Sequence, residues 1–206
     1  ADGIWVYGTD QLFLIYYVGP PFYFGYRQLL DNIGAVGKNA VVSVGREQYG
    51  VSQRGLFVTD GTQVQYIDEP TIRDYLFQQG NAAETYMNKE QLSKVFVWHD
   101  PTQSTINVFY PKGTSKVNNW GVGYNYQNKS AHILGYGRSA ATSGEVFYWP
   151  FLFDTEGNIF QEVVGESSPA VGNSPLTLEA TYDMTTGYGF AGYGEGGNGG
   201  KTNGPG

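Results

Sequence analysis

Residues 40–67 read AVVSVGREQYGVSQRGLFVTDGTQVQYI, and this stretch decides the fold class. It contains four apolar-rich runs of strand length, at 40–44, 47–51, 55–59 and 63–67. Short polar turns separate them, at Gly45-Arg46, at residues 52–54 and at Asp60-Gly61. Asp-Gly between alternating apolar residues is one of the strongest hairpin signals. The stretch therefore predicts four antiparallel strands in sequence order.

The same pattern continues in both directions along the chain. Upstream, we expect a strand pair at 5–7 and 12–18 around the turn at 8–10, a break at Gly19-Pro20-Pro21, a strand at 22–26 and a short helical turn at 28–33. Downstream, we expect hairpins from 95–98 with 106–110, from 120–126 with 130–136 and from 145–153 with 158–164, followed by a strand at 176–182.

Two short segments carry helical signals instead. Thr71 and Asp74 have the spacing of a capping box just after Pro70, and Ile72 and Leu76 share one helical face with Tyr75. This predicts a helix that ends by residue 80. A second short helix is expected over 88–94.

The composition favours strands and excludes several kinds of site. The chain has 17 Tyr and 12 Phe, which suit half-buried pleated surfaces, and 30 Gly, about double the usual share. It has no Cys, which excludes disulfides, thiolate nucleophiles and Cys-based zinc sites. No apolar run is long enough for a membrane-spanning helix.

Groups of strands start near residues 41, 95 and 146, a spacing typical of propeller blades once the helical insert is allowed for. We predict an all-β fold, a β-propeller-like array of antiparallel four-stranded sheets with one or two short helices inserted. The expected divisions are N-terminal strands and a loop at 1–39, the propeller-like domain at 40–184, and a Gly-rich flexible tail at 185–206. So few groups suggest an open arc that another chain completes, and the start at Ala1 without Met suggests a processed product or a fragment.

No motif predicts catalysis or nucleotide binding. Residues 196–202 end in Gly-Lys-Thr, as a phosphate-binding loop does, but Glu195 stands where the first Gly of that motif belongs. His99 and His132 lack the neighbouring ligands of a helical zinc site. Asp100, beside His99, is explained by the turn before Pro101. We predict no catalytic, cofactor-binding or metal-binding residues.

Two further patterns concern binding. A glycosidase would need two facing carboxylates, which the acidic residues at 60, 68, 69, 145, 154, 156 and 162 could supply, although Asp60 and Asp154 are better explained as turn residues. Seven tyrosines could form a sugar-binding or protein-binding face, or could be half-buried core residues; they are Tyr7, Tyr16, Tyr17, Tyr23, Tyr26, Tyr124 and Tyr126.

The order of these elements resembles the packaged-DNA stabilisation and tail-nozzle proteins of short-tailed bacteriophages, the tail tubular protein B-like family. The likeness is carried by residues 55–61 (GLFVTDG), 72–77 (IRDYLF), 94–96 (KVF), 106–111 (INVFYP), 123–126 (GYNY), 138–140 (RSA) and 154–162 (DTEGNIFQE). It covers about seven-tenths of the chain. Members of that family are much longer, and the Gly-rich tail has no counterpart in them, so a partial or divergent member is implied.

The resemblance implies a virion protein of the phage tail, a nozzle or hub that retains packaged DNA and forms part of the ejection channel. It implies a homo-oligomeric ring, a hexamer, in contact with portal, adaptor or other tail proteins, and no catalytic residues. The net charge of −7 suits a channel through which DNA passes without sequence-specific contact. A channel-facing cluster of Lys38, Arg46, Lys112 and Lys116 would contradict this. The alternatives are a carbohydrate-binding β-propeller, lectin or glycosidase-like, and a self-assembling adhesive protein.

Overall fold

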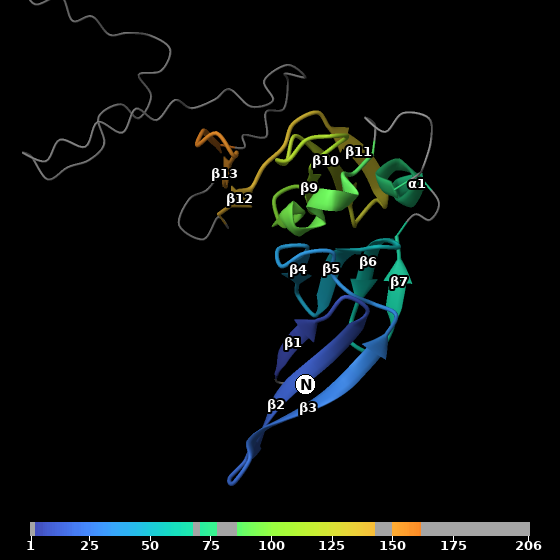
Figure 1. Ribbon diagram of the computed structural model, residues 1–206, viewed down its shortest axis with the longest axis vertical. Helices are drawn as coiled ribbons and strands as arrows, with labels where there is room; N and C mark the ends of the chain where they lie inside the picture. The colour runs from blue at the N-terminus through green and yellow to red at the C-terminus, as the bar shows by residue number, and fades with distance from the viewer. Residues whose placement is uncertain (1–2, 68–70, 78–85, 143–149, 162–206) are drawn as a thin grey trace, which may run out of the picture. The chain divides into compact units, whose positions relative to one another are not determined.

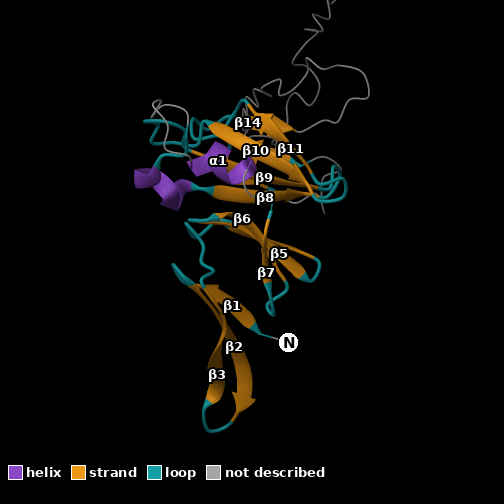
Figure 2. Cartoon of the chain, turned by 90° about the vertical axis from the view of Figure 1, so that its right-hand side faces the viewer, coloured by secondary structure: helices purple, strands orange, loops and turns teal. Residues whose placement is uncertain are grey.

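The computed structural model describes residues 3–67, 71–77, 86–142 and 150–161. The chain divides into two compact units, residues 1–139 and 140–206. Antiparallel strands dominate the described residues, and Figure 2 shows the helical segments in purple as short elements among them. The all-β fold class is therefore confirmed.

The first sheet of unit 1 has three strands in the order β1-β2-β3. They are β1 (Ile4–Tyr7), β2 (Gln11–Gly19) and β3 (Tyr23–Asp31). The expected first strand pair is confirmed, but the helical turn predicted over 28–33 is wrong. Arg27 and Gln28 pair with Leu14 and Phe13 of β2, because the ladder started by the hairpin continues to Asp31.

The second sheet is the meander that residues 40–67 predict. Its strands are β4 (Val41–Val44), β5 (Glu47–Ser52), β6 (Gly55–Thr59) and β7 (Val64–Tyr66), in the order β4-β5-β6-β7. All four lie within a residue or two of their expected bounds. Glycines with positive φ stand at the first and last turns, Gly45 (φ 61°) and Gly61 (φ 84°).

The third sheet is also a four-stranded meander. It contains β8 (Phe96–Asp100), β9 (Thr105–Tyr110), β10 (Trp120–Asn125) and β11 (Ser130–Leu134). Between the second and third sheets lie α1 (Thr71–Phe77) and η1 (Lys89–Lys94). Both expected helical segments are confirmed, although η1 is a 3-10 helix, capped where the Asn88 side chain accepts a bond from the Glu90 N–H.

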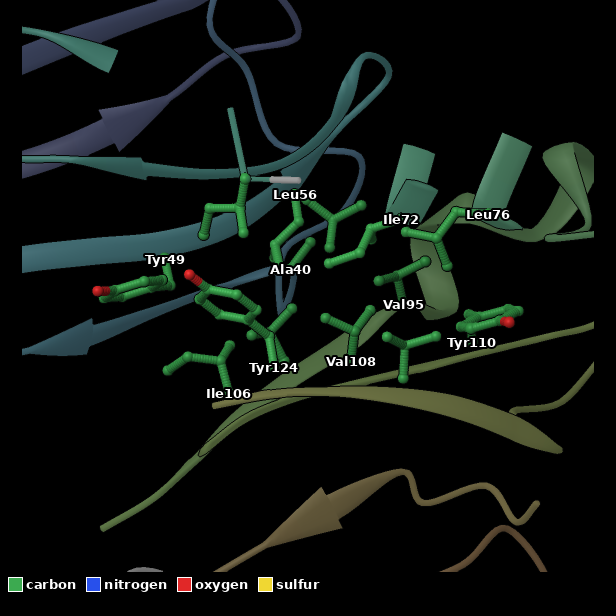
Figure 3. Packing of buried hydrophobic residues seen from close by; sticks show 14 of the residues in the cluster. Ala40, Tyr49, Leu56, Ile72, Leu76, Val95, Ile106, Val108, Tyr110 and Tyr124 are labelled. Carbon is green, nitrogen blue, oxygen red and sulfur yellow. The ribbon is translucent and has the colours of Figure 1, made fainter. Parts of the chain in front are cut away.

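The β4–β7 sheet is buried on both faces. Leu56 belongs to a large cluster that includes Ile106 and Val108 of β9, whereas the next residue, Phe57, belongs to a second cluster with Leu12 of β2. Successive strand residues point to opposite faces, so β6 contributes to two cores at once. Figure 3 shows the first cluster, where Leu56 lies across from Ile106 and Val108. Three successive sheets thus pack face to face.

The leading strands of the second and third sheets lie side by side. β4 contacts β8, and a parallel bridge joins Asn39 to Phe96. In that bridge the Val97 N–H donates to the Asn39 carbonyl over 2.8 Å. Face-to-face sheets whose first strands run parallel and adjacent are what neighbouring propeller blades require. A propeller itself stays a prediction.

The described part of unit 2 is a three-stranded antiparallel sheet. Its strands are β12 (Ala140–Ala141), β13 (Phe151–Phe153) and β14 (Ile159–Gln161). β13 and β14 lie inside the expected hairpin of 145–153 with 158–164, and β12 was not expected. The strand predicted at 176–182 and the Gly-rich tail lie outside the described residues.

Candidate functional surface: an aromatic hairpin

The end of the β2–β3 hairpin carries a concentration of exposed aromatic side chains. Figure 1 shows β2 and β3 continuing together beyond β1, and the register agrees, because β1 pairs only with residues 12–15 of β2. Beyond Ile15 the hairpin is a two-stranded arm. Its exposed large side chains are Tyr17, Val18, Phe22, Tyr23, Phe24 and Tyr26.

The arm is apolar on both faces. Tyr17 pairs with Phe24, and their rings meet edge to face with centroids 6.2 Å apart. On the opposite face a Cβ built on Gly25 would lie 3.0 Å from Val18 Cγ1 and 3.1 Å from Tyr16 Cζ, so these two side chains lie over the glycine. Among the described residues, no other sheet packs against either face of the tip.

The turn at the end of the arm presents a phenylalanine at its apex. The turn contains Gly19 with φ 87°, a cis Pro20-Pro21 peptide bond and Tyr23 with φ 56°. Phe22 follows the prolines and is 82% exposed, the largest exposed fraction among the exposed apolar side chains. The ladder ends at the Gly19–Tyr23 pair and the two prolines follow it, so Phe22 has no cross-strand neighbour to cover it.

The seven tyrosines that could form a binding face or be half-buried core residues divide between these two alternatives. Tyr17, Tyr23 and Tyr26 are exposed on the hairpin, and Tyr16 lies there half-buried. The other three tyrosines belong to the core. Tyr7 packs beside Phe57 and donates a hydrogen bond to Gln48 Oε1 over 2.7 Å. Tyr124 is 8% exposed, and Tyr126 packs on Tyr49. The exposed-face alternative therefore describes the hairpin tyrosines, and the core alternative is confirmed for the other three.

The tyrosine pattern does not include Phe22, Phe24 and Val18, which belong to the same exposed patch. A signal for them was present, because residues 11–26 contain no Asp, Glu, Lys, Arg or His. Such a run around a Gly-Pro-Pro turn combines a surface location with an apolar composition. That combination indicates an exposed apolar patch near the turn, although Leu12 and Leu14 at the start of the run are buried in the core.

The acidic turn residues have structural partners. Asp60 Oδ1 accepts bonds from the Thr62 N–H (2.8 Å), the Thr62 hydroxyl (2.7 Å) and the Gln63 N–H (3.0 Å). The Thr62 hydroxyl is the main cause of a lowered pKa at Asp60. Asp154 Oδ1 accepts from the Glu156 and Asn158 N–H groups in the same way. The interpretation of both residues as turn residues is confirmed; positions 68, 69, 145 and 162 lie outside the described residues.

The two histidines also have local explanations. His99 Nε2 lies 3.1 Å from the Tyr126 hydroxyl, and burial lowers the pKa of His99 although the neighbouring Asp100 acts in the opposite sense. Asp100 is buried and accepts bonds from the Thr102 N–H and hydroxyl, which confirms its turn role. His132 lies over Gly123, where a Cβ would overlap its ring.

A polar cleft of about 330 Å³ lies where three turns of unit 1 meet. It is lined by Thr9, Asp10, Asn32, Gly34, Ser52, Gln53, Arg54 and Tyr66. Its polar groups bond to one another: Ser52 Oγ accepts from the Arg54 N–H over 3.0 Å, and the Tyr66 hydroxyl donates to the Asn32 carbonyl over 3.3 Å. The cleft therefore serves to join turns.

Other expected features give no further site within the described ranges. No group of three His, Asp or Glu side chains there could hold a metal ion. The helices described are all too short or too polar to cross a membrane. Of the four basic residues considered for a channel, Lys38, Arg46 and Lys116 are exposed, and Lys112 Nζ lies 3.7 Å from the centre of the Trp120 ring. The Gly-Lys-Thr segment at 196–202 lies outside the described residues.

No protein-family model matches the chain, and no curated protein matches it either. The resemblance to the phage tail-nozzle family therefore stays an expectation that rests on the sequence motifs alone.

Proposed function

We propose that the chain is a structural protein of a short-tailed phage tail, a nozzle or hub component whose copies form a ring around the DNA ejection channel. In that role it retains packaged DNA and conducts it during ejection. It acts through shape and rigidity rather than through catalysis.

The observation that carries the proposal is the serial packing of sheets in unit 1. The β4–β7 sheet is buried on both faces, and β4 lies parallel to β8. A wall built in this way resists deformation, because bending it would disrupt two close-packed cores together. The family resemblance supplies the virion context and the ring of copies, of which six are expected.

The charge of the chain favours a passage through which DNA moves freely, rather than a surface that binds DNA. With 12 basic against 19 acidic residues, the chain has little means of releasing counterions from phosphates. We expect the full chain to show no salt-dependent retention of duplex DNA in a gel-shift assay. Tight binding that weakens steeply with added salt would contradict the conduit role.

Cryo-electron microscopy and native mass spectrometry of the full chain test the proposal. The expected result is a closed ring of copies, without Lys38, Arg46, Lys112 and Lys116 gathered on its channel. A chain that stays monomeric at every concentration, or one that forms fibres, would contradict it. Specific Ca²⁺-independent binding on a glycan array would favour the carbohydrate-binding alternative.

A further inference from the structure

We propose that the tip of the β2–β3 hairpin is a lipid-contact element that seats in the interfacial layer of a bilayer. The inference goes beyond the proposed tail function and does not depend on it, because it rests only on the surface of the hairpin. Its residues are the exposed set defined above, from Tyr17 to Tyr26.

The exposed apolar area of the tip is large for a chain of this size. Its five exposed rings, on Tyr17, Phe22, Tyr23, Phe24 and Tyr26, are 56–82% exposed. At roughly 200 Å² for a whole aromatic side chain, they present on the order of 700 Å² to solvent. The largest apolar patch on an ordinary monomer is about 300–600 Å², and such patches are often functional.

The shape of the patch favours an environment that surrounds it. Tyr17 and Phe24 lie on one face of the arm, Val18 lies on the other, and Phe22 is at the apex. A flat protein partner would cover one face and leave the other in water. Lipid covers both faces and the apex at once.

The order of residue types matches the gradient of polarity at a membrane surface. Phe22 and Phe24 are near the apex, tyrosines at 16, 17, 23 and 26 stand around them, and the first charge on β3 is Arg27. Tyrosine is enriched at the headgroup level, because its ring is apolar and its hydroxyl stays hydrated. The arm therefore becomes more polar from the tip toward its base.

Backbone hydrogen bonding limits the depth of insertion. β2 is paired with β1 only as far as Ile15, so toward the tip the outer edges of both strands have no partner strand among the described residues. Unpaired backbone groups are costly in hydrocarbon but are satisfied by water and headgroups at the interface. The tip therefore reaches about 5–10 Å into the headgroup and acyl boundary and does not cross the bilayer.

The electrostatics predict which lipids the tip prefers. The sixteen residues 11–26 carry no charge, so no ion is desolvated when the tip enters lipid. The whole chain carries −7 and repels an anionic surface. Binding should therefore be strongest on zwitterionic membranes and insensitive to high salt, unlike binding through a polybasic segment.

Flotation of the full chain with phosphatidylcholine vesicles tests the proposal. The wild-type chain is expected to float with the vesicles at low and at high salt. Replacing both apex rings, Phe22→Ser with Phe24→Ser, should weaken partitioning by about tenfold or more. The matched control is Val117→Ser with Ile133→Ser, two apolar residues exposed elsewhere on unit 1, which should change partitioning by less than about twofold.

Two outcomes would overturn the proposal. The first is a wild-type chain that does not float, or an apex variant that floats like the wild type while its thermal midpoint is unchanged. The second is an apex variant whose mass by light scattering falls in the absence of vesicles, which would assign the tip to a second copy of the chain. The first outcome does not bear on ring assembly, whereas the second would make the tip a contact between copies.

Discussion

The contact between Gly50 and Phe57 provides a direct test of how the second sheet packs. These residues are paired across β5 and β6, and the Phe57 ring lies over the glycine. A Cβ built on Gly50 would lie 2.6 Å from Phe57 Cζ and 2.9 Å from Val41 Cγ2. Gly50→Ala is therefore an overpacking change, which we expect to lower the free energy of unfolding by about 1–3 kcal/mol.

Removing the Phe57 ring should destabilise the protein more than Gly50→Ala does. It should also relieve part of the crowding that the methyl group of Gly50→Ala causes. Phe57 is fully buried between the first two sheets, so Phe57→Ala should cost about 3–5 kcal/mol. In the double variant the alanine at 50 meets a cavity in place of a ring. The two losses should therefore sum to more than the measured loss, by about 0.5–3 kcal/mol.

Urea unfolding followed by tryptophan fluorescence measures all four corners of this cycle, with constant m values as the check on two-state behaviour. Gly135→Ala is the control, because nothing lies within 4 Å of a Cβ at that position and its φ is not in the left-handed region. It should change the stability by less than about 0.5 kcal/mol. If the losses in free energy of unfolding from the Gly50 and Phe57 changes are additive, the packing of the Phe57 ring over Gly50, on the face of the sheet that β1–β3 covers, is refuted.

Three further predictions concern the third sheet. Burial lowers the pKa of His99 below 6.5, so the unfolded chain takes up a proton before the folded chain does as the pH falls. The free energy of unfolding should therefore decrease as the pH falls from about 6.5 toward the lowered pKa. Urea titrations at several pH values should show a smaller decrease for His99→Gln. Asp100→Ala leaves the Thr102 N–H and hydroxyl without their acceptor and should cost about 1–3 kcal/mol by the same assay, while an unchanged midpoint would contradict the turn role. Tyr75→Phe removes the acceptor of the 2.8 Å bond from Trp120 Nε1; a loss of about 0.5–1.5 kcal/mol with a shifted tryptophan emission is expected, and no change in either would argue against α1 packing on β10.

The strands and turns of unit 1 could be predicted because their signals are local. The turn at Asp60-Gly61 needs a positive φ and a side-chain acceptor, and both are visible in two adjacent letters of the sequence. The apolar run Leu56-Phe57-Val58, bounded by Gly55 and the Asp60-Gly61 turn, likewise predicts a strand without any knowledge of its neighbours. The helical turn predicted over 28–33 is wrong for the complementary reason. The pattern of that segment is weak by itself, and pairing with β2 decides its conformation.

The sequence by itself determined the all-β class, most strand limits and the turn roles of Asp60, Asp100 and Asp154, because backbone conformation at turns and short strands depends on nearby residues. Only the tertiary structure decided which side chains meet water. Tyr26 and Tyr124 both lie on strands, yet the first is 77% exposed and the second 8%, because β10 is covered by another sheet and the arm of β2 and β3 is not. Exposure depends on residues far apart in the chain, and for this reason the exposed apolar tip of the β2–β3 hairpin could be defined only once the sheets were placed.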